Sequence, residues 1–68
     1  MKYYWFLYRI RDTALDVEHC IDSVTSNHPF QEITAIKKQL KKAPAIITLE
    51  NWKEITEQEF DLFNKLKQ

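Results

Sequence analysis

The sequence predicts an α+β fold of ββαβα type, with a three-stranded antiparallel or mixed sheet of strand order 2-1-3 and two helices on one face. Two observations predict this fold. Aromatic and β-branched residues gather in three separate segments, which is typical of strands. Two further segments carry apolar residues at helical spacing, each preceded by a cap signal. Because 68 residues form one core at most, we expect a single domain over residues 1–68.

The first strand is expected over residues 2–11, where tyrosine, tryptophan, phenylalanine and isoleucine dominate. This apolar run is far shorter than the ~20 residues that a membrane helix needs. No small-residue cleavage site follows it, so a signal peptide is not expected. We therefore expect a soluble, cytoplasmic protein.

The second segment, residues 17–24, fits two structures. Val17, Ile21 and Val24 match a helical stripe, but alternate residues of the segment also fit one side of a strand. Two strands alone make a marginal sheet, which favours a third strand here. Residues 12–16, Asp-Thr-Ala-Leu-Asp, indicate the turn of a hairpin that joins it to the first strand.

A helix is expected to begin at Pro29, because proline fits the first helical position, with Asn27 or His28 as its cap. Lysines gather in its last turn, where they complement the helix dipole, and Pro44 ends the element. Its inner face is predicted from spacings of three, three and four residues. That face consists of Phe30, Ile33, Ile36 and Leu40.

Residues 45–55 alternate as a third strand, with Ile47 and Leu49 on one side. The other side is expected to carry Ile46, Thr48, Glu50 and Trp52. A second helix follows. Its start is indicated by a capping box of Thr56 and Glu59. Its inward residues are predicted to be Phe60, Phe63 and Leu66.

A hairpin followed by a helical crossover places the third strand on the free edge of the first strand, which becomes central. Alternation divides this central strand into two sets of side chains. The wholly apolar set is the better core beneath the helices and consists of Tyr4, Phe6, Tyr8 and Ile10. The opposite set is expected on an open face and consists of Tyr3, Trp5, Leu7 and Arg9.

The segments "HPF" (residues 28–30) and "WKEITEQEFDLFNKL" (residues 52–66) carry a resemblance. The chain resembles a loose set of very small proteins from bacterial, phage and mobile-element genomes. These share an aromatic amino-terminal strand, a His-Pro-Phe helix start and a Lys-Glu-Ile-(Ser/Thr)-x-x-Glu-(Tyr/Phe) carboxy-terminal helix. The resemblance covers about half of the chain. It implies the ββαβα layout and a mobile-element origin, and it implies no catalytic residue.

The composition excludes several classes of chemistry. The chain has no glycine, which phosphate-binding loops, dinucleotide fingerprints and nucleophile elbows require. A lone Cys20 excludes an intramolecular disulfide. His19 beside it would point to the opposite face of a strand, and no metal-ligand spacing of Cys or His is present. We expect no enzyme, no catalytic residue, no metal, no cofactor and no small-molecule substrate.

The aromatic strand favours a non-enzymatic protein–protein interaction module of phage or mobile-element origin. Trp, Tyr and Arg dominate interface hot spots, and a contiguous exposed apolar patch on a small monomer marks a contact surface. The module would self-associate as a homodimer or block a host or defence protein. The alternative is that a loop or the sheet twist covers these rings as core. The predicted partner-binding residues are Tyr3, Trp5, Leu7, Arg9 and Trp52.

A second interpretation is a small nucleic-acid-binding protein, in which sheet aromatics stack bases and a basic helix end contacts phosphates. Ten basic and ten acidic residues balance, whereas strong nucleic-acid binders carry a clear positive excess. The interaction module is therefore favoured. The predicted nucleic-acid contacts are Lys37, Lys38, Lys41 and Lys42.

Overall fold

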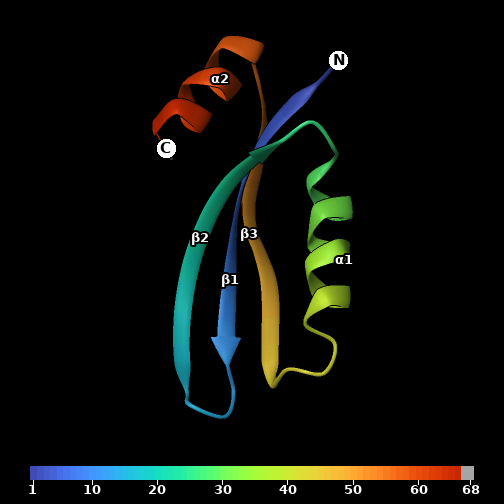
Figure 1. Cartoon of the computed structure of the whole chain (residues 1–68), viewed down its shortest axis with the longest axis vertical. Helices are drawn as coiled ribbons and strands as arrows, with labels where there is room; N and C mark the ends of the chain where they lie inside the picture. The colour runs from blue at the N-terminus through green and yellow to red at the C-terminus, as the bar shows by residue number, and fades with distance from the viewer. Residues whose placement is uncertain (67–68) are drawn as a thin grey trace.

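The computed structural model describes residues 1–66 and confirms the ββαβα order (Figure 1). The sheet has the predicted order β2-β1-β3, and both pairings are antiparallel. Residues 17–24, which fitted either a helix or a strand, form most of β2. The elements are β1 (Tyr3–Asp12), β2 (Val17–Thr25), α1 (Pro29–Gln39), β3 (Ala45–Ile55) and α2 (Glu57–Leu66).

The β1–β2 hairpin turns without a glycine. Asp12 Oδ1 accepts hydrogen bonds from the backbone N–H groups of Ala14 (2.9 Å) and Leu15 (3.1 Å), the Asx pattern that stabilises turns. Asp16 adopts a left-handed backbone (φ 54°), which aspartate tolerates better than most residues. Its carboxylate lies 2.8 Å from the guanidinium of Arg11. Aspartates at both ends therefore hold the turn.

The pairing of β1 with β3 contains a bulge. Leu7 pairs with Asn51 and Tyr8 pairs with Leu49, which leaves Glu50 as an extra residue in β3. Directly paired residues share one face of a sheet. An extra residue therefore reverses the face on which each later side chain of β3 lies.

The bulge moves Trp52 to the other face from the one predicted. Trp52 pairs with Phe6 and lies on the same side of the sheet as Ile47, which pairs with Ile10. The sequence-based prediction placed these two side chains on opposite sides, because strict alternation assumes that no residue is inserted. We refer to the side that carries Phe6 as the α1 face and to the side that carries Trp5 as the α2 face.

The main core lies between the α1 face and α1, as predicted for the set of β1 side chains that contains Phe6. Its buried apolar residues are Phe6, Ile33 and Ile47, which are 3%, 7% and 7% exposed. Phe6 also stacks on Tyr8, with ring centroids 5.6 Å apart. Partly buried side chains surround this centre: Tyr8, Ile10, Ile36, Leu40 and Leu49.

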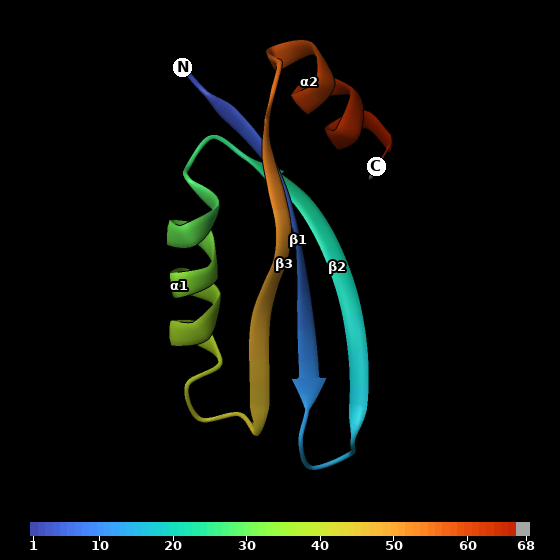
Figure 2. The same cartoon turned by 180° about the vertical axis from the view of Figure 1, so that it is seen from behind.

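The two helices lie on opposite faces of the sheet, so the prediction that both cover one face is wrong. Phe60 of α2 packs on Tyr3 with ring centroids 4.5 Å apart, and Tyr3 is on the α2 face. Figures 1 and 2 show α1 beside β3 and α2 on the other side, near β2. The bulge accounts for this position. It turns Ile55, the last residue of β3, to the α2 face opposite Tyr3, and Thr56 alone links β3 to α2.

The predicted capping box of α2 is confirmed. The backbone N–H of Glu59 donates to Thr56 Oγ1, and the backbone N–H of Thr56 donates to Glu59 Oε1, both at 3.1 Å. Phe60 and Phe63 are half-buried as expected, but Leu66 is 86% exposed. The prediction that Leu66 faces inward is wrong, because the last turn of α2 lies beyond β2 (Figure 1).

His28, one of the two predicted candidates, caps α1. Its Nδ1 accepts a hydrogen bond of 3.2 Å from the backbone N–H of Phe30, and Pro29 behind it is fully buried. The other candidate, Asn27, donates instead to the carboxylate of Glu32 at 3.1 Å. Phe30 was predicted on the inner face of α1 but is 59% exposed, since it precedes the part of the helix that crosses the core.

Candidate interaction surfaces

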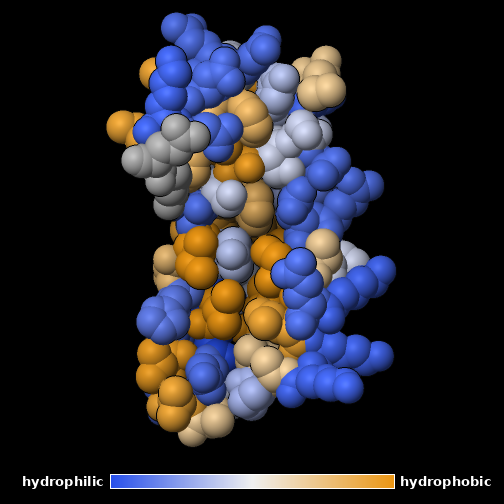
Figure 3. Space-filling view, viewed as in Figure 1, coloured by the Kyte–Doolittle hydropathy of each residue, from blue (hydrophilic) through white to orange (hydrophobic). Residues whose placement is uncertain are grey.

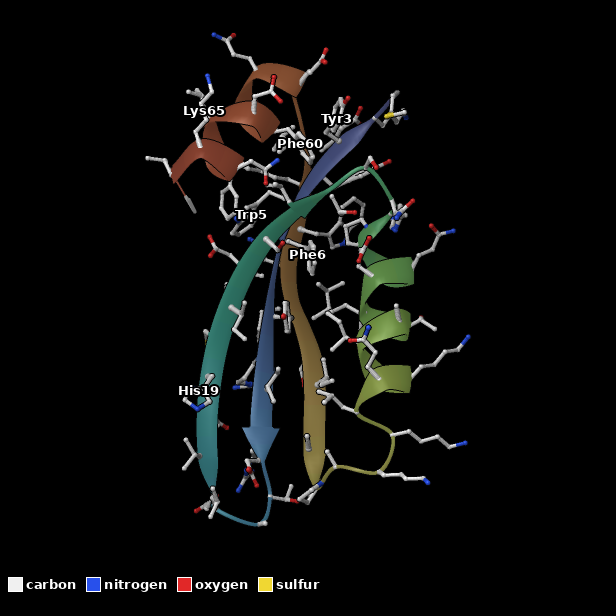
Figure 4. The ribbon with its side chains drawn as sticks, viewed as in Figure 1. Tyr3, Trp5, Phe6, His19, Phe60 and Lys65 are labelled. Carbon is white, nitrogen blue, oxygen red and sulfur yellow. The ribbon has the colours of Figure 1, made fainter. Side chains whose placement is uncertain are left out.

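Tyr3 and Trp5, two of the predicted partner-binding residues, lie beneath α2 rather than on an open face (Figure 4). The ring of Tyr3 packs on Phe60. The indole Nε1–H of Trp5 donates to Asp22 Oδ2 at 3.3 Å, and the Nζ atom of Lys53 lies 5.9 Å from its ring centroid. Both rings are half-buried. They contribute to the packing of α2 and do not form a free aromatic platform.

Leu7 and Arg9 continue along the α2 face, which becomes polar below α2. Leu7 is half-buried, and the guanidinium of Arg9 forms an ion pair with Glu50 at 2.9 Å. The flanking residues Cys20 and Thr48 are exposed. Trp52 lies on the other face. The structure therefore brings Tyr3, Trp5, Leu7 and Arg9 into one row along β1 and separates Trp52 from them.

A pocket of about 370 Å³ lies between α2 and the sheet. Its one acid, Glu59, belongs to the capping box. The backbone and side-chain hydrogen bonds from Thr56 hold the pKa of Glu59 below its ordinary value. The hydrogen bonds of the helix cap therefore favour the ionised form of this carboxylate. The pocket is lined by Trp5, Val24, Asn51, Lys53, Ile55, Glu59 and Phe63.

Four aromatic rings meet at the start of α1 and form what we call the aromatic corner: Tyr4, His28, Phe30 and Trp52. The imidazole of His28 is central. Its ring centroid lies 4.8 Å from those of Phe30 and Trp52 and 5.3 Å from that of Tyr4. Such spacings are typical of attractive aromatic pairs. The rings come from β1, β3 and the start of α1, so three elements fix their positions.

Two rings of the aromatic corner reach solvent. Phe30 is 59% exposed and Trp52 is 39% exposed, whereas Tyr4 and His28 are half-buried beneath them. Sequence reasoning named Trp52 but missed its three neighbours. The motif His-Pro-Phe predicted the start of α1. It could not predict that Trp52 packs beside His28, because this contact depends on the bulge at Glu50.

A second apolar area lies on the α1 face, where α1 leaves β2 uncovered. Figure 3 shows this area between β2 and the hydrophilic side chains of α1. Val17 and Ile21 are 40% and 37% exposed. They adjoin Ile10 and Tyr8, which are half-buried. We call these four residues the open strip.

The four predicted nucleic-acid contacts are all exposed: Lys37, Lys38, Lys41 and Lys42. They lie at the end of α1 and in the turn after it, far from α2 in Figure 1. Tyr3 and Trp5, the aromatics meant to act with them, lie beneath α2. The lysines and these rings therefore do not form one surface.

The histidines and the cysteine do not gather into a site. His19 pairs with Ile10 and Cys20 with Arg9, which places them on opposite faces as predicted. His28 belongs to the aromatic corner. Within residues 1–66, no three side chains of His, Cys, Asp or Glu lie close enough together to hold a metal ion. No helix in this part of the chain is long and apolar enough to cross a membrane.

Known proteins supply no assignment for this chain: no protein-family model, no curated protein and no solved structure matches it. The aromatic corner and the open strip are the features from which a function can be argued.

Proposed function

We propose that this protein is a non-enzymatic interaction module that binds another protein through the aromatic corner. The observation that carries the proposal is the exposure of Phe30 and Trp52 on a fixed frame. Their burial by a partner removes apolar area from water at about 25 cal/mol per Å². Because neighbouring rings already hold both side chains, little conformational entropy is lost on binding.

Polar and charged residues surround the aromatic corner, as is typical of a protein–protein interface. Hot spots are typically large side chains at the centre of a patch with a polar rim. Here the rim contains Gln31 beside Phe30 and Glu54, which pairs with Tyr4 on the sheet. Lys2 lies 4.0 Å from the carboxylate of Glu54. Both signs of charge are therefore available around the apolar centre.

The resemblance to mobile-element proteins favours a host or defence protein as the partner. This point remains a prediction, because it depends on the motifs alone. No specific observation favours the nucleic-acid interpretation, since α2 covers the two sheet aromatics on which it depended. We therefore carry only the protein-binding proposal forward.

The proposal is tested with two alanine variants of the exposed rings, Phe30→Ala and Trp52→Ala. The tagged protein is used to isolate partners from its own host, and the affinity of the purified complex is then measured by calorimetry. A hot-spot loss of about 2 kcal/mol weakens binding about 30-fold. We expect a loss of at least this size for one of the two variants.

Leu62→Ala is the matched control, because Leu62 is 53% exposed on α2, away from the aromatic corner. It should bind the partner like the unmodified chain. Circular dichroism confirms that each variant is folded. A partner bound equally by both ring variants and by the control would show that the aromatic corner is not the contact surface.

A further inference from the structure

We propose that β2 pairs antiparallel with β2 of a second copy of this chain, about a two-fold axis at His19. The interface would be the free edge of the sheet. It lies apart from the aromatic corner and does not rest on the proposed function. An edge strand presents unpaired backbone N–H and C=O groups, which are a template for another strand.

The two edges of the sheet differ in how they are protected. The β3 edge contains the bulge at Glu50 and an exposed lysine, Lys53, and α1 packs beside it. Bulges, lysines and covering helices all hinder pairing with another chain. The β2 edge has no lysine and no proline, and β2 pairs with β1 without a register shift. Self-pairing is therefore expected at β2.

The accessible part of β2 is its first half. Every residue of Val17–Ile21 is exposed. Residues 22–24 are half-buried and Thr25 is buried, at the end of β2 where α2 packs. The open segment is centred on His19, which lies away from both helices (Figure 4).

Three registers about a two-fold axis can be compared. An axis at Cys20 places Glu18 opposite Asp22 of the other copy, and this like-charge pair occurs twice. An axis at Ile21 extends the pairing to Thr25, whose hydroxyl is held by Glu32 at 2.6 Å. The register at Cys20 is therefore disfavoured by charge repulsion. The register at Ile21 is disfavoured because Thr25 is buried.

The axis at His19 avoids both problems. Val17 then lies opposite Ile21 of the second copy, twice, on the α1 face. Glu18 lies opposite Cys20 on the α2 face, so no like charges are paired within the segment. Because such an axis keeps the α1 faces of both copies on the same side, the two open strips lie side by side, with the two His19 side chains between them.

The proposed register can be tested by charge-swap substitutions at His19, an exposed position. In this register His19 of one copy lies opposite His19 of the other. The variants His19→Lys and His19→Glu should therefore each stay monomeric, because two like charges would repel each other. An equimolar mixture should form heterodimers. The masses are measured by sedimentation velocity, with the unmodified chain expected to reach twice the monomer mass as its concentration rises.

His19→Thr is the neutral control and should still dimerise, while Phe30→Ala should dimerise like the unmodified chain. Circular dichroism shows whether each variant is folded. An unmodified chain that stays monomeric up to its solubility limit overturns the proposal. Folded charge variants that fail to form heterodimers on mixing overturn the register at His19. Loss of the dimer in Phe30→Ala would place the contact at the aromatic corner instead of the β2 edge.

Disulfide trapping tests the same register with the native thiol. A Glu18→Cys/Cys20→Ser chain is mixed with the unmodified chain under mild oxidation, and cross-linked heterodimers are separated by mass. We expect faster cross-linking than in a mixture with Thr48→Cys/Cys20→Ser, in which the new thiol lies on the same face but on β3. Equal rates would indicate random collision and overturn the proposal. Faster cross-linking of Cys20 with itself would assign the axis to Cys20.

Discussion

At the scale of single residues, Thr56 and Glu59 determine whether α2 begins where it does. Each side chain accepts a hydrogen bond from the backbone N–H of the other. No residue of the described α2 is fully buried, and Phe60 and Phe63 are half-buried, so local capping adds to the limited stability that packing gives this short helix. A change in this pair should therefore affect α2 and leave the sheet intact.

The lowered pKa of Glu59 gives α2 a pH dependence. Because the pKa is lower in the folded chain than its ordinary value of 4.5, the stabilisation is complete above that value. It is lost as pH falls through the lowered pKa. An NMR titration should give a carboxyl midpoint for Glu59 below 4.5, with amide protection of α2 falling over the same range.

Thr56→Ala provides the control for this titration, because it removes the hydroxyl of the cap. In this variant the midpoint should move up toward the ordinary value. A midpoint at or above 4.5 in the unmodified chain would show that the capping box does not form in solution.

At the scale of elements, one polar contact joins the end of β2 to α1. The hydroxyl of Thr25 donates to Glu32 Oε1 at 2.6 Å and accepts from the backbone N–H of Asn27 at 3.0 Å. Thr25 is only 9% exposed. The contact fixes the position of α1 relative to the sheet, and with it the position of His28 and Phe30 in the aromatic corner.

Thr25→Val removes both hydrogen bonds while keeping the shape of the side chain. Hydrogen bonds to charged groups contribute about 1.5–3 kcal/mol, so we expect a loss of about 1–2 kcal/mol in the free energy of unfolding from this partly exposed pair. Urea denaturation measures it. Thr48→Val, at an exposed strand position, should change the value by less than about 0.5 kcal/mol. Equal effects of the two substitutions would contradict the assigned role of Thr25.

The order of the elements and strands could be predicted because it depends on local signals. Alternation, proline positions and the capping box fixed the elements, and short connections then allowed one economical strand order. The bulge at Glu50 could not be predicted, since nothing in "TLENWK" distinguishes an inserted residue from regular alternation. The wrong face for Trp52 and the wrong side for α2 both follow from it.

The candidate surface was predicted only in part for the same reason. Trp52 was named, but its contacts with Phe30 and His28 depend on the bulge and on the position of α1. Tyr3 and Trp5 were placed on an open face because α2 was expected above Phe6. Adjacency between distant segments is a tertiary property that periodicity along the chain does not contain.

At the scale of the whole molecule, the surface is large for the mass. The accessible area is 5211 Å², whereas a monomer of 8.2 kDa is expected to expose about 4,500 Å². One reason is that the helices lie on opposite faces, so each face is only partly covered. Exposed apolar side chains at the aromatic corner and the open strip are the direct result.

So small a core makes Phe6 decisive for folding. Phe→Ala substitutions in cores cost about 3–5 kcal/mol, and a domain of this size has a net stability of about 3–5 kcal/mol. Phe6→Ala should therefore be largely unfolded at 25 °C by circular dichroism. Ile46→Ala, at a 55% exposed position on β3, should unfold cooperatively near the midpoint of the unmodified chain. A folded Phe6→Ala variant would mean that the core does not depend on this ring.

The extra residue in β3 has a genetic consequence. Loss of the single codon for Glu50 would remove the bulge, but Leu7 would still pair with Asn51 and Phe6 with Trp52, so Trp52 would stay beside His28. Ile55 would likewise stay opposite Tyr3, and α2 would still leave β3 on the α2 face. Because the bulge holds one unpaired residue, an in-frame deletion at this point can shorten β3 without moving an aromatic ring from one face of the sheet to the other.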